Sequence, residues 1–210
     1  MEAIHKVFNL IILDESGSMY EIQDTIISGF NEIVQTVKGV AGQYPEQKHF
    51  ITLVSFNSLA VKTILENEDV SKLKPIDRSL YNPSAGTPLY DAMGNSIQHL
   101  RQLTDSLTDY NVLVTILTDG EENSSREFNG KAIKKMIDEL KQKNWTFTYI
   151  GANHDVEKFA LSISITNTMK FEANEADMKR MFTEEKNSRS RYSEKIRNKE
   201  NTSDDFYKEK

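Results

Sequence analysis

The feature that most constrains the fold of this chain is a short, nearly continuous apolar run, residues 7–13, which ends at Asp14. An apolar run without polar alternation is typical of a strand that is buried on both faces, as in the centre of a parallel sheet. A second run, residues 111–118, has a similar character and also ends at an aspartate, Asp119. We therefore expect a parallel sheet with both aspartates at the carboxyl ends of their strands.

Segments with other periodicities lie between these runs. In residues 19–37, apolar side chains recur every three or four positions, which is typical of an amphipathic helix packed on a sheet. Residues 49–56 and 60–65 are β-prone and flank the turn-forming pair Asn57-Ser58, which predicts an antiparallel hairpin. The remaining pattern predicts helices at 88–107, 131–143, 156–161 and 175–186, strands at 145–150 and 168–171, and a loop at 66–84. Alternating strands and helices with short connections predict an α/β sheet that helices cover on both faces.

Length and composition bound the number of domains. With 210 residues, 38% of them hydrophobic, the chain is long enough for one domain with a sizeable core. We expect that domain to span residues 1–186. Residues 187–210 are polar, with interleaved charges and almost nothing to bury, so they are expected to form a mobile tail or a frayed helix extension.

Charge and residue usage disfavour several classes of function. The 26 Lys and Arg residues against 32 Asp and Glu residues give a net charge of −6, which argues against nucleic-acid binding. The lack of cysteine excludes thiolate chemistry and fits a reducing compartment, and the four histidines are not spaced as zinc ligands. The sequence shows no secretory signal and no apolar run near the roughly 18 residues of a membrane span. We therefore expect a soluble cytoplasmic protein that binds neither nucleic acid nor membrane.

Five oxygen-bearing side chains are expected to meet at one edge of the predicted sheet. Asp14, Ser16 and Ser18 follow the first strand at i, i+2 and i+4, Thr87 stands at a helix start, and Asp119 ends a strand. Two carboxylates and three hydroxyls suit a hard cation, above all Mg²⁺, with Mn²⁺ or Ca²⁺ as alternatives. An open coordination position would make such a site a receptor for another carboxylate.

These residues resemble the metal-ion-dependent adhesion site (MIDAS) of the von Willebrand factor type A (vWA) domain, whose pattern is D-x-S-x-S, a distant Thr and a distant Asp. The resemblance covers roughly residues 4–172. It implies a three-layer α/β/α, Rossmann-like fold with a doubly wound, mostly parallel sheet and one antiparallel edge strand. It also implies that the ion accepts an acidic residue from a partner protein. The segments that carry it are Asp14-Glu15-Ser16-Gly17-Ser18, Gly86-Thr87-Pro88-Leu89-Tyr90-Asp91-Ala92 and Leu117-Thr118-Asp119-Gly120.

Other interpretations of the same residues stay open at this point. Ser16, Ser18 and Thr87 are also suited to cap helix N-termini, with Pro88 at the first helical position. Asp91 either supports the site from outside or favours the N-terminus of its helix electrostatically. Three flanking carboxylates are expected to be solvated surface charges or to tune partner specificity: Glu15, Glu121 and Glu122.

We expect a metal-dependent protein-binding module rather than an enzyme, of the kind that joins a larger intracellular complex. One alternative is a metal-dependent hydrolase or phosphatase in which Asp14 is the nucleophile. Against it, the sequence has no nucleophile–base pair and no Gly-rich phosphate loop. Another alternative is a structural module with an idle metal site, whose thermal stability would not respond to metal.

Overall fold

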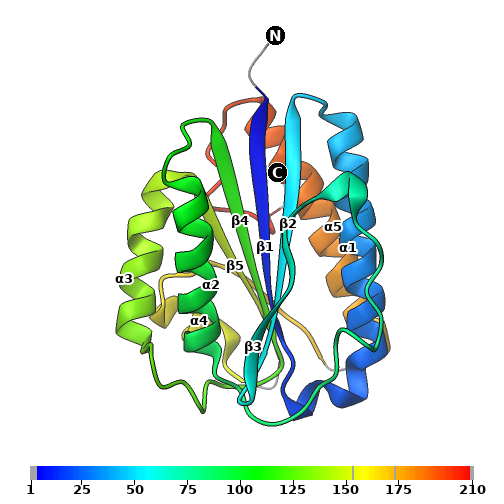
Figure 1. Ribbon diagram of the computed structural model, residues 1–210, viewed down its shortest axis with the longest axis vertical. Coiled ribbons are helices and arrows are strands. Elements are labelled where there is room, and N and C mark those ends of the chain that lie inside the picture. Colours follow the sequence, from blue (N-terminus) through cyan, green and yellow to red (C-terminus); the bar gives the residue numbers. More distant parts are fainter. Residues whose placement is uncertain (1–3, 153, 173, 209–210) are drawn as a thin grey trace.

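The computed structural model describes residues 4–152, 154–172 and 174–208. They form one six-stranded sheet with the strand order β3-β2-β1-β4-β5-β6. Every neighbouring pair is parallel except β2 and β3, whose antiparallel hairpin puts β3 at one edge (Figure 1). The strands are β1 (His5–Asp14), β2 (Gln47–Asn57), β3 (Ala60–Asp69), β4 (Tyr110–Thr118), β5 (Trp145–Gly151) and β6 (Asn167–Lys170). The predicted fold class is confirmed.

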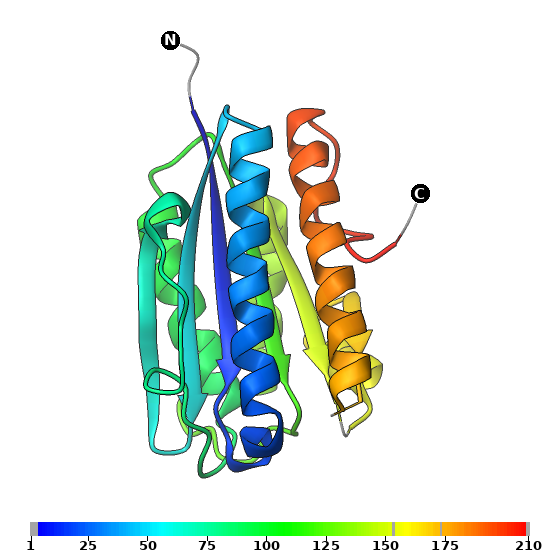
Figure 2. The same cartoon turned by 90° about the vertical axis from the view of Figure 1, so that its right-hand side faces the viewer.

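Helices cover both faces of the sheet and give the molecule three layers. The helices α2, α3 and α4 lie on one face, and α1 and α5 lie side by side on the other (Figure 1, Figure 2). Among the described residues, no helix combines the length and apolar character needed to cross a membrane. The α-helices are α1 (Gln23–Gln43), α2 (Leu89–Thr104), α3 (Gly130–Leu140), α4 (Val156–Ser162) and α5 (Glu175–Arg197). Three short 3-10 helices are η1 (Gly17–Ile22), η2 (Val70–Lys72) and η3 (Lys141–Lys143).

The alternation of side chains along each strand explains why the core has two large hydrophobic clusters. On β1, Phe8, Leu10 and Ile12 belong to the cluster under α2, whereas Ile11 and Leu13 belong to the cluster under α1. All five are at most 5% exposed, as expected for a central parallel strand. Because helices cover both faces, the polar residues that follow the strands gather at the carboxyl edge of the sheet, at the lower end of Figure 1.

The C-terminal segment departs from the prediction. Residues 187–210 were expected to form a mobile tail or a frayed helix extension. Where the structure describes them, α5 continues to Arg197 as a helix extension, and the chain then turns back along the domain. Phe206 is 4% exposed and packs edge-on against Tyr192. The expectation that this segment buries almost nothing was wrong, because charged residues of α5 that form a buried ion pair have the composition of a solvated helix face. In addition, β3 runs to Asp69, into a segment predicted as loop.

A close contact between α1 and α5 depends on Gly29. A β-carbon at this position would lie 2.0 Å from the ring of Phe182, which is itself 5% exposed. We expect Gly29→Ala to lower the free energy of unfolding by about 1–3 kcal/mol, because the buried ring has little room to move away. Urea unfolding followed by circular dichroism measures this loss.

Gly39→Ala is the matched control on the same helix, since a β-carbon there meets no atom within 4 Å. Helix propensity alone predicts that this variant is more stable than the parent by up to about 1 kcal/mol. Equal stabilities of the two variants would contradict the close packing of α1 on α5.

Candidate metal centre

The loop that follows β1 positions the first aspartate. Asp14 is 0% exposed, and its Oδ1 accepts a hydrogen bond from the backbone N–H of Ser16 at 2.7 Å. Its Oδ2 accepts a hydrogen bond from the hydroxyl of Thr118, at the end of β4. Burial is the main cause that raises the pKa of Asp14 to about 6. A carboxylate in such surroundings is costly to ionise unless a positive charge lies nearby.

Two serine hydroxyls connect this loop to the second aspartate. Ser18 Oγ donates a hydrogen bond to Asp119 Oδ1 at 2.6 Å and lies 3.2 Å from Ser16 Oγ. Asp119 is 3% exposed, and burial is again the main cause that raises its pKa. Four of the five predicted residues therefore lie together where β1 and β4 end.

Thr87 approaches the same place from the segment before α2. Its hydroxyl lies beside Gly120, where an added β-carbon would be 3.5 Å from Thr87 Oγ1. Asn123 holds the Thr87 backbone: its side chain accepts from the Thr87 N–H at 3.0 Å, and its N–H donates to the Thr87 carbonyl at 3.1 Å. The N–H of Gly17 donates to the carbonyl of Ala85 and thereby joins this segment to the loop after β1. Hydrogen bonds thus connect the chain around Thr87 to the loop after β1, through Ala85, and to the loop after β4, through Asn123.

The oxygen atoms of this cluster fit a small, hard cation. In an octahedral site with metal–oxygen distances of about 2.1 Å, neighbouring ligand oxygens lie roughly 3.0 Å apart. The separations of 2.6 Å from Ser18 to Asp119 and 3.2 Å from Ser18 to Ser16 fall on either side of that value. Two carboxylates with neutral oxygen donors are a ligand set suited to Mg²⁺. In the described part of the chain, no group of three or more His, Cys, Asp or Glu residues is placed to hold a metal, so a metal at this cluster would depend on the two carboxylates together with the hydroxyls.

The alternative interpretation of the Ser16 and Thr87 hydroxyls as helix caps does not hold. Ser16 precedes η1 but makes no side-chain capping hydrogen bond. The N-cap of α2 is Pro88 rather than Thr87, and it too makes no side-chain capping bond. The hydroxyls of Ser16 and Thr87 are therefore available for another role.

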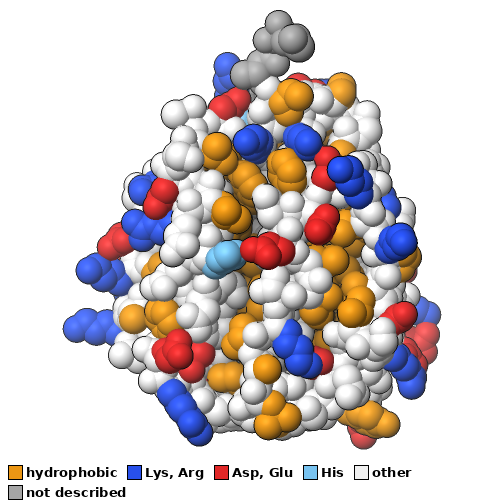
Figure 3. All heavy atoms as spheres, in the orientation of Figure 1, with side chains coloured by type: hydrophobic (Ala, Val, Ile, Leu, Met, Phe, Trp, Pro, Cys, Tyr) orange, Lys and Arg blue, Asp and Glu red, His pale blue; other side chains and the backbone are white. Residues whose placement is uncertain are grey.

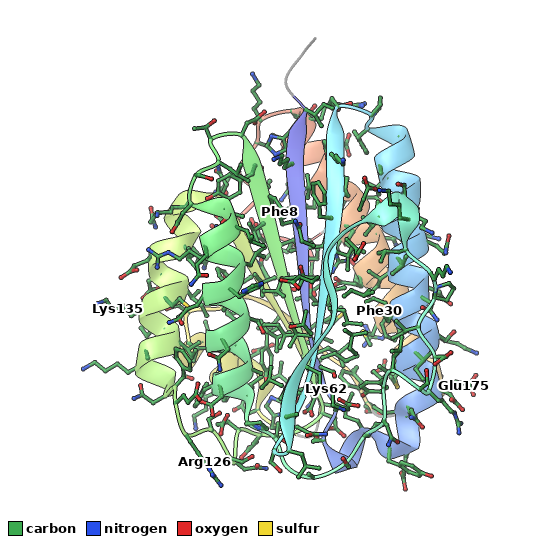
Figure 4. All side chains as sticks on the ribbon, viewed as in Figure 1. Phe8, Phe30, Lys62, Arg126, Lys135 and Glu175 are labelled. Carbon is green, nitrogen blue, oxygen red and sulfur yellow. The ribbon has the colours of Figure 1, made fainter. Side chains whose placement is uncertain are left out.

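Glu15 is not the solvated surface charge that was expected. It is 0% exposed: Oε2 accepts a hydrogen bond from Ser55 Oγ at 2.7 Å, and Oε1 accepts one from the N–H of Asn82 at 2.7 Å. Lys62, labelled on β3 in Figure 4, places Nζ 3.3 Å from Oε2. This carboxylate therefore holds three segments together and is not accessible to a partner. Glu121, in contrast, is exposed as expected.

Glu122 and Asp91 shape the loop between β4 and α3. The carboxylate of Glu122 accepts hydrogen bonds from the N–H groups of Tyr90 and residues 124–125, at 2.7–2.9 Å. The carboxylate of Asp91 accepts from the N–H groups of residues 126–128, also at 2.7–2.9 Å. Glu122 is therefore not a free surface charge. Asp91 supports the site from outside, because it fixes the loop between β4 and α3, which begins at Asp119.

Three residues that hold the site were missed in the sequence: Thr118, Tyr81 and Asn123. Besides the Thr118 hydroxyl on Asp14, the Tyr81 hydroxyl donates to the Asp14 carbonyl at 2.7 Å. Thr118 could have been found, since it directly precedes a strand-end aspartate at the same sheet edge. Nothing local marks Tyr81, because it lies in the irregular stretch 66–84, whose path only the fold determines.

Comparison with known proteins decides the family. The model of the von Willebrand factor type A domain matches residues 10–195 of this chain. The chain belongs to the vWA domain family. The match includes most of α5, so the likeness to the family extends beyond residue 172, where the resemblance was expected to end, and beyond residue 186, the predicted end of the domain. The vWA family often mediates protein–protein interactions. A comparison with curated proteins found no match.

Solved structures support the vWA fold. A von Willebrand factor type A protein from Catenulispora acidiphila is 18% identical with a TM-score of 0.54, over 87% of this chain and 42% of that one. Proximal thread matrix protein 1 from the mussel byssus is 12% identical with a TM-score of 0.55, over 85% of this chain and 44% of that one. The SpRpn10 VWA domain is 10% identical with a TM-score of 0.53, over 85% of this chain and 94% of that one. At these identities the likeness concerns the fold, and this chain spans less than half of the first two proteins.

Proposed function

We propose that this vWA domain is a protein-binding module that depends on a divalent metal ion, Mg²⁺ above all, with Mn²⁺ or Ca²⁺ as substitutes. Asp14, Ser16, Ser18, Thr87 and Asp119 hold the ion as a complete MIDAS, and an acidic side chain of a partner protein completes the coordination. The observation that carries the proposal is the convergence of oxygen-bearing side chains from three segments. Asp14, Ser16, Thr87 and Asp119 are buried, and the exposed Ser18 places its Oγ 2.6 Å from Asp119 Oδ1.

The chemistry of the five residues suits a receptor for a carboxylate. A bound divalent ion supplies a positive centre at the carboxyl edge of the sheet. Three of the five residues contribute uncharged hydroxyls, so only Asp14 and Asp119 offset the charge of the ion. Since electrostatic interactions are stronger in a partly buried site than in bulk water, an acidic group from outside is attracted there.

Metal is expected to stabilise the folded chain through this site. At 100 times its dissociation constant, a ligand that binds only the folded state adds about 2.7 kcal/mol to the free energy of unfolding. Asp14→Asn should remove this gain, because the buried carboxylate is lost. The variant should still fold, since the Thr118 hydroxyl has a second acceptor in the carbonyl of Gly120 at 3.1 Å. Thermal unfolding with MgCl₂, and with chelator, measures both effects.

Glu121→Gln is the matched control, since it removes an exposed carboxylate next to the site without touching the buried cluster. We expect this variant to keep the full response to metal. A parent protein whose unfolding temperature is the same with metal and with chelator would support an idle site and contradict the proposal.

The partner half of the proposal is tested by capture from a cytoplasmic extract, the compartment that the lack of cysteine favours. Proteins retained by the parent with Mg²⁺ should be lost with chelator and with Asp14→Asn or Thr87→Ala. We propose that the captured partner belongs to a larger intracellular complex. Partners retained equally in every condition would remove the metal from the recognition step.

The phosphatase alternative is disfavoured by the surroundings of Asp14. A carboxylate nucleophile must reach the substrate, but Asp14 is 0% exposed and both of its oxygens accept hydrogen bonds. We therefore expect no turnover of generic phosphoesters in the presence of Mg²⁺. Turnover that disappears in Asp14→Asn would overturn the assignment as a binding module.

A further inference from the structure

Several exposed hydrophobic side chains lie on segments that border the candidate metal centre. Among the described residues, seven large hydrophobic side chains are exposed: Ile4, Tyr20, Leu59, Val61, Leu80, Leu103 and Leu161. Four of these, Tyr20, Leu59, Val61 and Leu80, lie on segments that border the site, and we call them the apolar rim. Figure 3 shows hydrophobic side chains at the surface of this lower end of the molecule.

Chain continuity and hydrogen bonds connect the segments that carry the rim to the segments of the candidate metal centre. Tyr20, 65% exposed, lies in η1, which follows the metal-site loop directly. Leu59, 77% exposed, lies in the β2–β3 turn, where the Ser58 hydroxyl accepts from the N–H of Gly86, the residue before Thr87.

Leu80 and Val61 complete the rim. Leu80, 45% exposed, directly precedes Tyr81, whose hydroxyl bonds to the Asp14 carbonyl. Val61, 40% exposed, is the second residue of the edge strand β3 and lies two positions after Leu59. The rim residues therefore come from three segments that adjoin the oxygen cluster.

The opposite border of the site has a different character. The loop between β4 and α3 exposes the charged residues Glu121, Arg126 and Glu127, and Figure 4 labels Arg126 at the lower margin of the molecule. This loop exposes no large hydrophobic side chain. The two borders thus differ in their exposed hydrophobic residues: η1, the β2–β3 hairpin and the loop before α2 carry all four, among exposed charges such as Lys62 and Arg78, and the loop between β4 and α3 carries none.

We propose that the partner of this domain presents a carboxylate flanked on one side by apolar side chains, which pack on the rim while the carboxylate reaches the ion. The inference rests on the proposed function, because the carboxylate needs the metal. Single exposed hydrophobic residues are ordinary on protein surfaces, but a group beside a cation site offers two kinds of contact at once. The cation selects an acidic residue, and the rim selects its neighbours.

The contribution of the rim comes from removing apolar area from water. Even partial burial of two leucine side chains against a partner is expected to strengthen binding on the order of tenfold. The sequence suggested that Glu15 tunes the specificity for a partner, but this carboxylate is buried. The exposed apolar rim would tune that specificity instead.

A library of short peptides with a fixed central glutamate tests the inference. With MgCl₂ present, we expect the parent chain to select leucine, isoleucine or phenylalanine on one side of the glutamate. The double variant Leu59→Ser/Leu80→Ser should bind the selected peptides on the order of tenfold more weakly and lose the apolar preference. It should still require both the glutamate and the metal. Leu103→Ser, which removes an exposed leucine near the far end of α2, is the matched control and should bind as the parent does.

The outcomes separate this inference from the proposed function. Metal-dependent selection of glutamate without any apolar preference would overturn the inference and leave the proposed function standing. Equal binding of peptides in which glutamine replaces glutamate would overturn both. Self-association of the parent that the double variant abolishes, without an apolar preference in the peptides, would assign the rim to a second copy of this chain and overturn the inference. Circular dichroism of each variant verifies that the fold is intact.

Discussion

Arg189→Met is expected to lower the free energy of unfolding by about 3–5 kcal/mol, because it leaves a carboxylate buried without its partner. Arg189 is 3% exposed and Glu185 is 0% exposed. The guanidinium donates to Glu185 Oε1 at 2.9 Å, to Asn9 Oδ1 at 2.9 Å and to Thr115 Oγ1 at 2.8 Å. The hydroxyl of Tyr207 donates to Glu185 Oε2 at 2.9 Å. This network joins β1, β4, α5 and the C-terminal segment.

Two further variants make the prediction specific. Arg180→Met breaks an ion pair with Asp177 on the same helix, where the arginine side chain is 58% exposed, and should cost no more than about 1 kcal/mol. The double variant Arg189→Met/Glu185→Leu replaces both charges by apolar groups and should recover much of the stability. Urea unfolding measures all three. A loss for Arg189→Met as small as that for Arg180→Met would contradict the buried network.

His49 is expected to make the fold sensitive to acid. It is 3% exposed, and neither ring nitrogen has a hydrogen-bond partner among the described residues. Burial first, and then the charges of Arg189 and His5, lower the pKa of His49 from 6.5 to about 4. Between these values the unfolded chain takes up a proton that the folded chain does not, so stability falls as the pH drops from about 6.5 to 4. The shift corresponds to a loss of roughly 3 kcal/mol.

The contribution of His49 is isolated by comparing the parent with His49→Leu. The raised pKa of Asp14 acts in the opposite direction, because the folded chain takes up that proton first and gains stability on acidification. This effect is present in both proteins and cancels in the difference. We expect the stability difference between the two proteins to change by roughly 3 kcal/mol in favour of the variant from pH 7 to pH 4. A difference that does not change with pH would show that His49 is not buried as a neutral ring.

The fold could be predicted in large part because its strands and helices carry strong local patterns. The run that became β1 is apolar on both faces, and this alone requires cover on both sides of the sheet. Likewise, Asp14 and Asp119 could be placed at one edge, since the ends of parallel strands coincide there. The family assignment confirms the predicted fold class, and the sheet order, in which β1 and β4 are neighbours, confirms that the two strands end at the same edge.

Side-chain direction within loops could not be predicted in the same way. Glu15 lies between two residues of the oxygen cluster, but its carboxylate is buried against β2, β3 and the loop before α2. The N-cap of α2 was predicted at Thr87 but lies at Pro88, one position later. The prediction failed because a threonine hydroxyl suits an N-cap and other roles equally well. The path of a loop depends on contacts with distant segments, and these have no local signature.

Composition misled most strongly at the C-terminus. Glu185 and Arg189, four positions apart on α5, have the spacing of a surface ion pair. Their burial follows from polar residues on the sheet, Asn9 and Thr115, which provide the remaining hydrogen bonds. These partners lie on strands distant in the sequence, so only the assembled fold identifies the pair as internal.

The bond between Asn9 and Arg189 spans 180 positions, from the first strand of the chain to its last helix. During synthesis at about 5–20 residues per second, the strand therefore waits roughly 9–36 s for the helix that completes it. Throughout that interval, Asn9 and Thr115 lack the hydrogen bonds from the Arg189 guanidinium. The apolar residues around them on that face of the sheet are not yet covered by α5. Docking of α5 thus completes this face of the sheet only after all six strands have been synthesised, and the uncovered face is exposed to aggregation until then.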